Sequence, residues 1–214
     1  MAGRLAPSLV FLVLLALSAC RTGSGDEQPV IQPGAPGQDS RVVSAPEVAG
    51  QPEPPHTQAD VMFMQGMIHH HAQALDMVEL LRTRTESDGM RKLAQRIELS
   101  QRDEIQMMRE WLEARGAEAP GEHAHHAPGA PMMPGMLTPA EMDRLAAAKG
   151  AGFDRLFLEY MIKHHAGALV MVKELFSTPG AGQESEIFAF ASDVDADQLI
   201  EIRRMDGMLK ELQK

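Results

Sequence analysis

The stretch DVMFMQGMIHHHAQALDMV, residues 60–78, decides the fold because the chain nearly repeats it as DRLFLEYMIKHHAGALVMV, residues 154–172. Eleven of the nineteen paired positions are identical at this offset of 94 residues. A weaker match at an offset of 97 pairs QRDEIQMMREWL, residues 101–112, with QLIEIRRMDGML, residues 198–209. Helical spacing of apolar residues appears throughout these segments, and the alternation typical of strands does not. The sequence therefore predicts an all-α four-helix bundle made of two duplicated helical hairpins.

The predicted helix ends have local causes. TQAD, residues 57–60, predicts an N-terminal cap for the first helix, and Gly116 predicts the end of the second. TPAE, residues 138–141, predicts a capping box that opens a short additional helix. STPGAG, residues 177–182, is expected to break the chain before the fourth main helix.

The N-terminal segment predicts a lipoprotein signal peptide over residues 1–19. Arg4 precedes an apolar run that is too short for a comfortable membrane span, and the following LSAC resembles the processing signal of bacterial lipoproteins. Cys20 is the only cysteine, which excludes an intrachain disulfide and favours lipidation, although an ordinary cleaved signal is the alternative. We therefore expect an exported protein, lipid-anchored in the bacterial cell envelope and facing the periplasm or the cell surface.

The rest of the chain divides by composition. Residues 20–58 are rich in Pro, Gly and polar residues and predict a disordered tether. Residues 59–214 predict the duplicated bundle domain, with a His/Met-rich loop at 116–137. The formal net charge of −10 argues against a nucleic-acid partner, because phosphate binding needs clustered Lys and Arg.

Helical phase predicts which histidines face the core. Successive residues on an α-helix are about 100° apart, so the inward stripe of the first motif holds two histidines among methionines, namely Met64, Met67, His70, His71 and Met77. His69 falls on the opposite side and is predicted at the surface. Its repeat partner is Lys163, a residue typical of solvent-facing positions.

Glu104 and Glu201 occupy the centres of the apolar stripes of the two partner helices. A carboxylate that faces a core costs several kcal/mol unless it is paired or coordinating. Its presence in both halves predicts contact with the histidines of the facing helix. A structural Glu–His or Glu–Arg contact is the alternative to a ligand role.

Imidazole and thioether together favour copper. Soft thioether donors select Cu(I), and imidazole accepts both Cu(I) and Cu(II). Sixteen methionines stand against one tryptophan and one tyrosine, more than gap-filling requires. A methionine stripe alone is more often ordinary core, but its joint repetition with paired histidines favours metal binding. The loop adds both donor types to a tract of metal-binding composition, at His123, His125, His126, Met132, Met133 and Met136.

The doubled M-I-x-H-H-x-x-A-x-x-M segment, with E-I-x-x-M in each following helix, resembles the domain of unknown function 305 family, which includes CopM-type copper-binding proteins. The resemblance covers about residues 59–214 and implies a ferritin-like bundle, export, and copper binding through His and Met in copper tolerance. The implied ligands are Met67, His70, His71, Met77, Met108, Met161, His164, His165, Met171 and Met205, with Met64, Glu104, Glu201 and the loop residues as further candidates. Leu158 stands where the first repeat has Met64, so a second site is expected to be poorer in sulfur.

The sequence thus predicts a non-enzymatic copper-binding protein, with Cu(I) favoured over Cu(II), that sequesters or passes copper to exporting or oxidising partner proteins. One alternative is a ferritin-like di-metal oxidoreductase, but such sites use four carboxylates and the bundle-facing acids found are Glu104 and Glu201. The other alternative is a structural helical-bundle lipoprotein without metal, whose methionines form adaptable contacts.

Overall fold

The computed structural model describes residues 30–32, 40–44, 46, 50, 52–121 and 132–212, which belong to two compact units divided after Pro52. In the first unit, β1 (Val30–Gln32) pairs with β2 (Arg41–Val43) in an antiparallel ladder that sets Val30 opposite Val43. The sequence did not predict these strands, because three residues are too few to show alternation. The predicted signal peptide and Cys20 lie outside the described residues.

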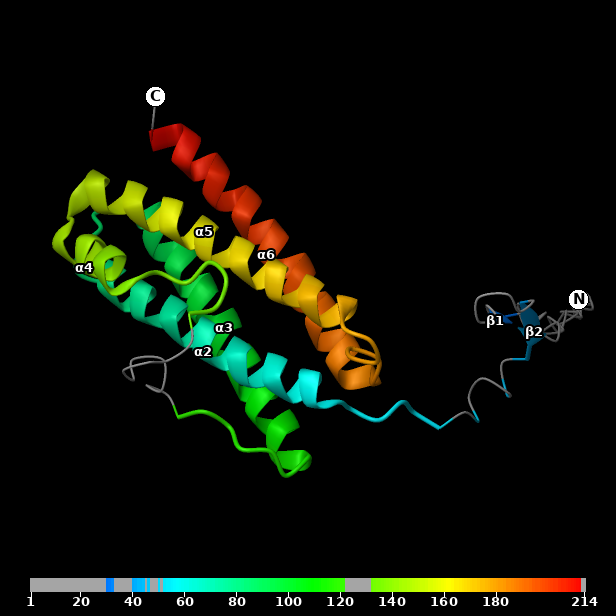
Figure 1. The fold of residues 1–214 in the computed structure, drawn as a ribbon. Coiled ribbons are helices and arrows are strands. Elements are labelled where there is room, and N and C mark those ends of the chain that lie inside the picture. Colours follow the sequence, from blue (N-terminus) through cyan, green and yellow to red (C-terminus); the bar gives the residue numbers. More distant parts are fainter. Residues whose placement is uncertain are drawn as a thin grey trace, which may run out of the picture. The chain divides into compact units, whose positions relative to one another are not determined.

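The second unit is helical, as the sequence predicted. Its elements are α2 (Gln58–Leu81), α3 (Asp88–Ala114), α4 (Pro139–Ala147), α5 (Gly150–Ser177) and α6 (Ser185–Leu212). The hairpin of α2 and α3 packs against the hairpin of α5 and α6 mainly through α2 and α5, and the short α4 contacts both (Figure 1). None of the helices in the described part of the chain combines the length and apolar character that crossing a membrane requires.

Both predicted capping boxes are present. The Thr57 backbone N–H donates to Asp60 Oδ2 at 2.6 Å, while the Asp60 backbone N–H donates to Thr57 Oγ1 at 3.3 Å. Thr138 and Glu141 make the same reciprocal pair at the start of α4. The buried Asp60 also accepts a hydrogen bond from the Gly182 backbone N–H at 2.7 Å, so the cap of α2 holds the turn before α6.

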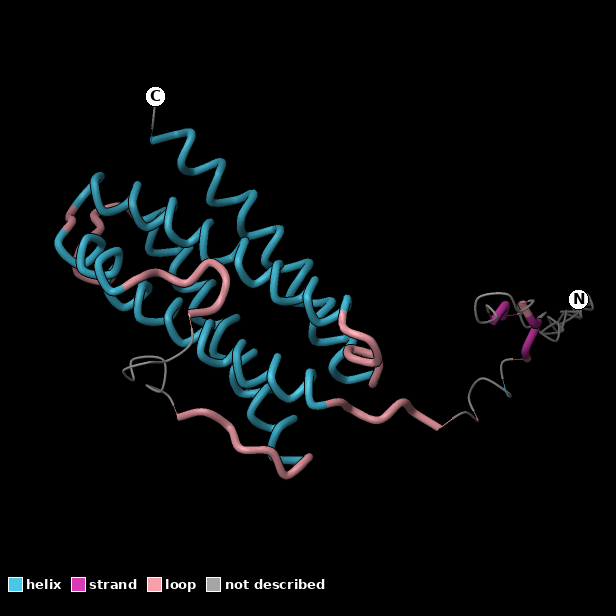
Figure 2. The backbone as a smooth tube through the Cα atoms, in the orientation of Figure 1, coloured by secondary structure: helices cyan, strands magenta, loops and turns pink. Residues whose placement is uncertain are grey.

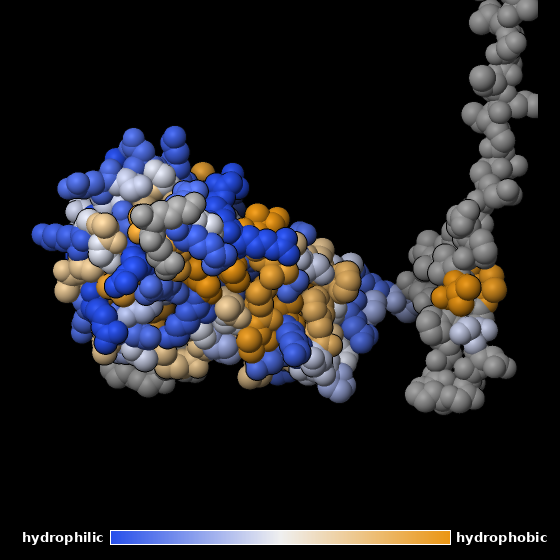
Figure 3. Space-filling view, turned by 90° about the horizontal axis from the view of Figure 1, so that it is seen from above, coloured by the Kyte–Doolittle hydropathy of each residue, from blue (hydrophilic) through white to orange (hydrophobic). Residues whose placement is uncertain are grey.

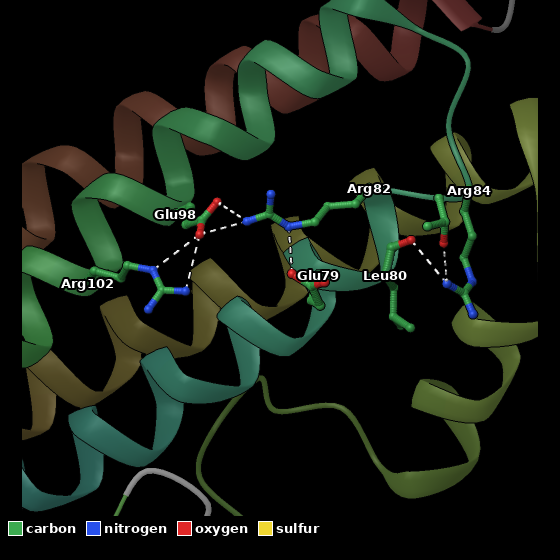
Figure 4. A network of polar contacts seen from close by, with 7 residues as sticks. Glu79, Leu80, Arg82, Arg84, Glu98 and Arg102 are labelled. Atoms are coloured by element: carbon green, nitrogen blue, oxygen red, sulfur yellow. Dashed lines mark hydrogen bonds and ion pairs between the residues drawn. The ribbon is translucent and has the colours of Figure 1, made fainter.

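The first hairpin carries an ion-pair network at the surface near the turn that joins α2 to α3 (Figure 4). Arg82 lies just beyond α2 and donates through Nη2 to both oxygens of Glu98 on α3, each at 2.9 Å. Arg102 approaches the same carboxylate from one turn further along α3. Exposed pairs of this kind contribute about 0–1 kcal/mol each, so the network orients the hairpin more than it stabilises it.

The apolar core is divided in two. The first core cluster takes residues 61–68 of α2, 105–112 of α3, 168–175 of α5 and 187–194 of α6. The second takes residues 74–81 of α2, 90–97 of α3, 153–161 of α5 and Met205 of α6. Between these segments lie buried polar residues of all four main helices. Apart from Gln73, which bonds the loop before α4, we call them the polar layer, two from each helix: His70, His71, Gln101, Glu104, His164, His165, Gln198 and Glu201.

Not all apolar residues are inside. Figure 3 shows apolar residues gathered on part of the face in view, with hydrophilic residues around them. The exposed large apolar residues of the helical unit include several methionines, among them Met62, Met107 and Met132.

The loop that leads into α4, here called the crossing loop (residues 132–138), lies across the bundle (Figure 2). Gln73 of α2 holds it with two hydrogen bonds to the backbone of Leu137, accepting from its N–H at 2.7 Å and donating to its carbonyl at 3.0 Å. Gly135 takes a φ of 79° and packs against Gly167 of α5, where a Cβ atom would approach the Pro134 carbonyl oxygen to 1.9 Å. The close approach therefore depends on glycine on both sides.

Candidate metal centre

Each hairpin contributes one buried histidine–glutamate pair to the polar layer. His71 of α2 is hydrogen-bonded through Nε2 to Glu104 of α3, and His165 Nε2 lies 2.6 Å from Glu201 Oε2 of α6. The prediction that both glutamates meet the histidines of the facing helix is confirmed. In the first hairpin, Ser100 also donates to Glu104 Oε1 at 2.7 Å.

The Glu104 carboxyl is held in its charged form. Burial alone would raise its pKa, but the hydrogen bond and charge of His71, together with the Ser100 hydroxyl, lower the pKa below its usual value. An ionised carboxylate only accepts hydrogen bonds. His71 is therefore the donor through Nε2, and in the neutral imidazole the lone pair lies on Nδ1.

The other two histidines of the layer meet across the two hairpins. The ring centroids of His70 and His164 are 3.8 Å apart, with the rings tilted by 37°. His70 Nε2 also donates to the Pro134 carbonyl of the crossing loop at 3.0 Å. This contact joins the crossing loop to the centre of the bundle.

Both stacked histidines are neutral at ordinary pH. The pKa of His70 is lowered to about 3, mainly by burial and also by the neighbouring His71, while the hydrogen bond to Pro134 opposes the shift. Burial, followed by the charges of His70 and His165, lowers the pKa of His164 well below its usual value. Neutral imidazole is the form that binds metals, so protons do not compete for these rings in mild acid.

Within the polar layer, three buried imidazole nitrogens have no hydrogen-bond partner among the described residues: Nδ1 of His71, Nδ1 of His165 and Nε2 of His164. Leaving a buried polar atom unpaired costs about 1–3 kcal/mol, so three in one layer call for an explanation. Metal-binding histidines almost always donate their second ring nitrogen to a carboxylate or carbonyl. His71 and His165 have this arrangement, which fits a metal ligand whose Nδ1 is available.

The candidate methionines of the helices flank the polar layer on both sides, and all of these are buried. The first core cluster holds Met64, Met67, Met108 and Met171, and the second holds Met77, Met161 and Met205. Because α2 and α5 each cross the layer, each cluster mixes methionines from both repeats. Met67 and Met77, which share the inward stripe of α2, lie on opposite sides of the layer.

The second core cluster contains four buried methionines, as many as the first. Leu158 does replace the Met64 equivalent there and is fully buried. Met90, near the start of α3, packs into the same cluster and supplies a further thioether. Met90 lies outside the repeated motif, so repeat comparison alone did not single it out.

The last candidates to place are groups of His, Cys, Asp or Glu side chains and the residues of the loop. Among the described residues, no three His, Cys, Asp or Glu side chains lie together as a group that could hold a metal ion. A site at the polar layer would therefore need thioether sulfur, or only two imidazoles. In the loop, Met132 is exposed, Met133 half-buried and Met136 buried, whereas His123, His125 and His126 lie outside the described residues.

His69 was predicted at the surface, and the structure makes it half-buried. It lines a groove between α2 and α5 together with Met133 and Pro134 of the crossing loop. The crossing loop covers this part of α2, which helical phase alone could not predict.

Gln101 and Gln198 belong to the polar layer although sequence reasoning did not choose them as site residues. Each is 1% exposed, and Oε1 of Gln101 has no hydrogen-bond partner among the described residues. They are one of the identical pairs at the offset of 97 residues. That identity, about one turn before each buried glutamate, is the feature of the sequence that could have assigned both glutamines to the polar layer.

Comparison with known proteins gives the same architecture. Residues 60–209 match the family model described as a domain of unknown function (DUF305). A DUF305 fragment from Deinococcus radiodurans is 33% identical, covering 74% of this chain and 99% of its own, with a TM-score of 0.62. A DUF305 protein from Streptomyces coelicolor, for which secretion is suggested by its name, is 30% identical, covering 72% and 94%, with a TM-score of 0.62.

CopM in its Cu(I)-bound form is 28% identical, covering 71% of this chain and 96% of its own, with a TM-score of 0.55. CopM has also been solved in Cu(II)-bound, Ag-bound and apo forms that resemble this chain. No protein in the curated collection of characterised sequences matches the chain. By its sequence match and its helical architecture, this chain belongs to the DUF305 family.

Proposed function

We propose that this protein is an exported, non-enzymatic copper-binding protein that holds Cu(I) through Met and His, and sequesters or passes the ion in copper tolerance. The observation that carries the proposal is the pair of buried histidines, His71 and His165. Each is bonded through Nε2 to a glutamate, and its Nδ1 finds no hydrogen-bond partner in the part of the chain that the structure describes. The resemblance to Cu(I)-bound and Cu(II)-bound CopM supports the choice of metal.

The donor set also favours a soft ion. Buried thioethers lie on both sides of the imidazoles, and Cu(I) accepts such donors with imidazole at low coordination number. Two carboxylates, already hydrogen-bonded to histidine, are fewer than the four of a ferritin-like di-iron site. Copper is thus the cargo, and the glutamates orient its ligands.

The test is a Cu(I) titration of the purified protein in competition with a coloured chelator, with Fe(II) and Zn(II) in parallel. We expect tight Cu(I) binding that is weakened in the double variant Met67→Leu/Met161→Leu, because leucine keeps the volume and removes sulfur. Met107→Leu, at a half-exposed position on α3, is the matched control. Binding of two irons with oxygen consumption would favour an oxidoreductase, and no metal binding would leave a structural bundle.

Anchoring belongs to the same proposal. Cys20 would carry the lipid, and the acidic domain would face the periplasm or the cell surface, where copper-exporting or copper-oxidising proteins are the expected partners. Cell fractionation of Cys20→Ala tests this, since the variant should leave the membrane fraction.

A further inference from the structure

A groove of about 520 Å³ between α2 and α5 opens to solvent, and its mostly apolar lining includes three methionines and one imidazole. Met62 is 64% exposed on its wall, His69 and Met133 are half-buried, and Met171 closes its inner side at 8% exposure. Glu174 is the charged residue in its lining, and none of the described residues around it is Lys or Arg. The groove is thus suited to a cation.

The helix places Met62 and His69 on the same face of α2, two turns and about 10.5 Å apart along the axis. Met62, Gly66 and His69 are separated by four and three residues, so they lie on one face of α2. Gly66 has no side chain to fill the space between the other two, and a Cβ atom there would lie 3.5 Å from the Met171 methyl carbon. Met171 therefore reaches the hollow that Gly66 leaves.

The second repeat lacks each of these features at the equivalent positions. Leu156, Tyr160 and Lys163 stand where the first repeat has Met62, Gly66 and His69. The corresponding face of α5 is covered by α4, because Lys163 pairs with Glu141 at 2.7 Å and Arg144 donates to the Tyr160 hydroxyl at 3.3 Å. The open, sulfur-lined face is therefore a property of one half of the duplicated fold.

The groove adjoins the polar layer and the first core cluster. Pro134 lines the groove and accepts a hydrogen bond from His70 of the layer, and Met171 belongs both to the groove and to the first core cluster. An ion held by Met62, Met133 and His69 would lie next to Met171, which packs in the same cluster as Met67 and Met108.

We propose that this groove is a separate, solvent-facing site for a soft monovalent cation such as Cu(I), through which the ion reaches or leaves the buried donors. Its ligands are Met62, His69 and Met133, with Met171 as the donor shared with the interior. The proposal rests on the proposed function for the identity of the cargo, and it adds a second site and a route.

The experiment is a titration of the full-length protein, labelled with ¹³C at the methionine methyl groups, with Ag(I) as a redox-stable probe of the Cu(I) site. Each signal is assigned with a Met→Leu variant. We expect saturable shifts of the Met62 and Met133 methyl signals, distinct from those of the buried methionines, while the half-exposed Met107 stays unchanged. In Met62→Leu, the affinity of the groove should fall about tenfold or more, on the scale that changes around metal ligands produce.

The outcomes separate this proposal from the previous one. Shifts confined to buried methionines such as Met67, Met108 and Met161 would overturn the groove and leave the copper-binding function intact. No shift at any methionine would overturn both. Because Met62 is largely exposed, its replacement by leucine leaves the packing unchanged, and a far-UV spectrum identical to that of the parent protein verifies this.

Discussion

At the scale of single residues, burying the polar layer costs folding free energy. Buried imidazoles and carboxylates forfeit hydration, and three ring nitrogens gain no hydrogen bond from the described residues in return. A fold selected for stability alone would replace these side chains with apolar ones of similar volume, which is often neutral or stabilising. Their presence in both halves is best explained by a ligand that uses them.

His70 and His164 should make the stability of the domain depend on pH. His70 has a pKa of about 3 in the folded protein and 6.5 in the unfolded chain, so between these values the unfolded chain binds more protons. The contribution of His70 to the free energy of unfolding should therefore be complete above pH 6.5. Below that pH it should fall by up to about 1.4 kcal/mol per pH unit, and His164 should act in the same direction.

Urea unfolding of the metal-free protein at pH 7.5, 6.5 and 5.5 measures this slope. The variant His70→Gln keeps a polar side chain without a titrating group, and its slope should be smaller by the share of one histidine. Glu104, whose pKa is lowered, and Asp197, whose pKa burial raises, act mainly at lower pH and in opposite directions. Equal slopes in parent and variant would contradict the assignment.

At the scale of elements, the crossing loop holds the two hairpins together near their centre. It is fixed to α2 by Gln73, to α5 by the contact of Gly135 with Gly167, and to the polar layer by Pro134. Gln73 and Gly167 are repeat partners at the offset of 94. The loop therefore contacts equivalent positions at which the two repeats differ. On α2, Gln73 holds the loop by hydrogen bonds, and on α5, Gly167 leaves space for its backbone.

Replacing Gly167 by alanine should destabilise the domain, although alanine is the better helix former. The new methyl group would meet the Pro134 carbonyl, and overpacking of this kind costs about 1–3 kcal/mol. Gly207→Ala on α6 is the matched control, because a Cβ atom there meets nothing within 4 Å, and it should gain up to about 1 kcal/mol. Denaturant midpoints of the two variants give the comparison, and equal midpoints would mean that the loop does not rest on Gly167.

At the scale of the whole molecule, the duplication made much of the fold predictable. The repeat at two offsets implied two hairpins, Thr57 and Thr138 marked helix starts, and the helical phase put His70 and His71 inside. The division of the methionines between two core clusters depends on how α2 crosses α5, which no local pattern encodes. The half-burial of His69 likewise depends on the crossing loop, a contact between segments far apart in sequence.

An ion held by His71 and His165 would join α2 to α5, and the two histidines are themselves bonded to glutamates of α3 and α6, so its binding should stabilise the whole helical domain. At a free Cu(I) concentration 100 times the dissociation constant, linkage adds about 2.7 kcal/mol, which corresponds to a rise in Tm of about 5–10 °C for a domain of this size. The double variant Met67→Leu/Met161→Leu should show little of this rise. Its metal-free Tm should stay close to that of the parent protein, because Met-to-Leu replacements usually cost less than about 1.5 kcal/mol each. Thermal scans of both proteins with and without Cu(I) decide the matter: an equal rise in the variant would place the copper away from the buried thioethers.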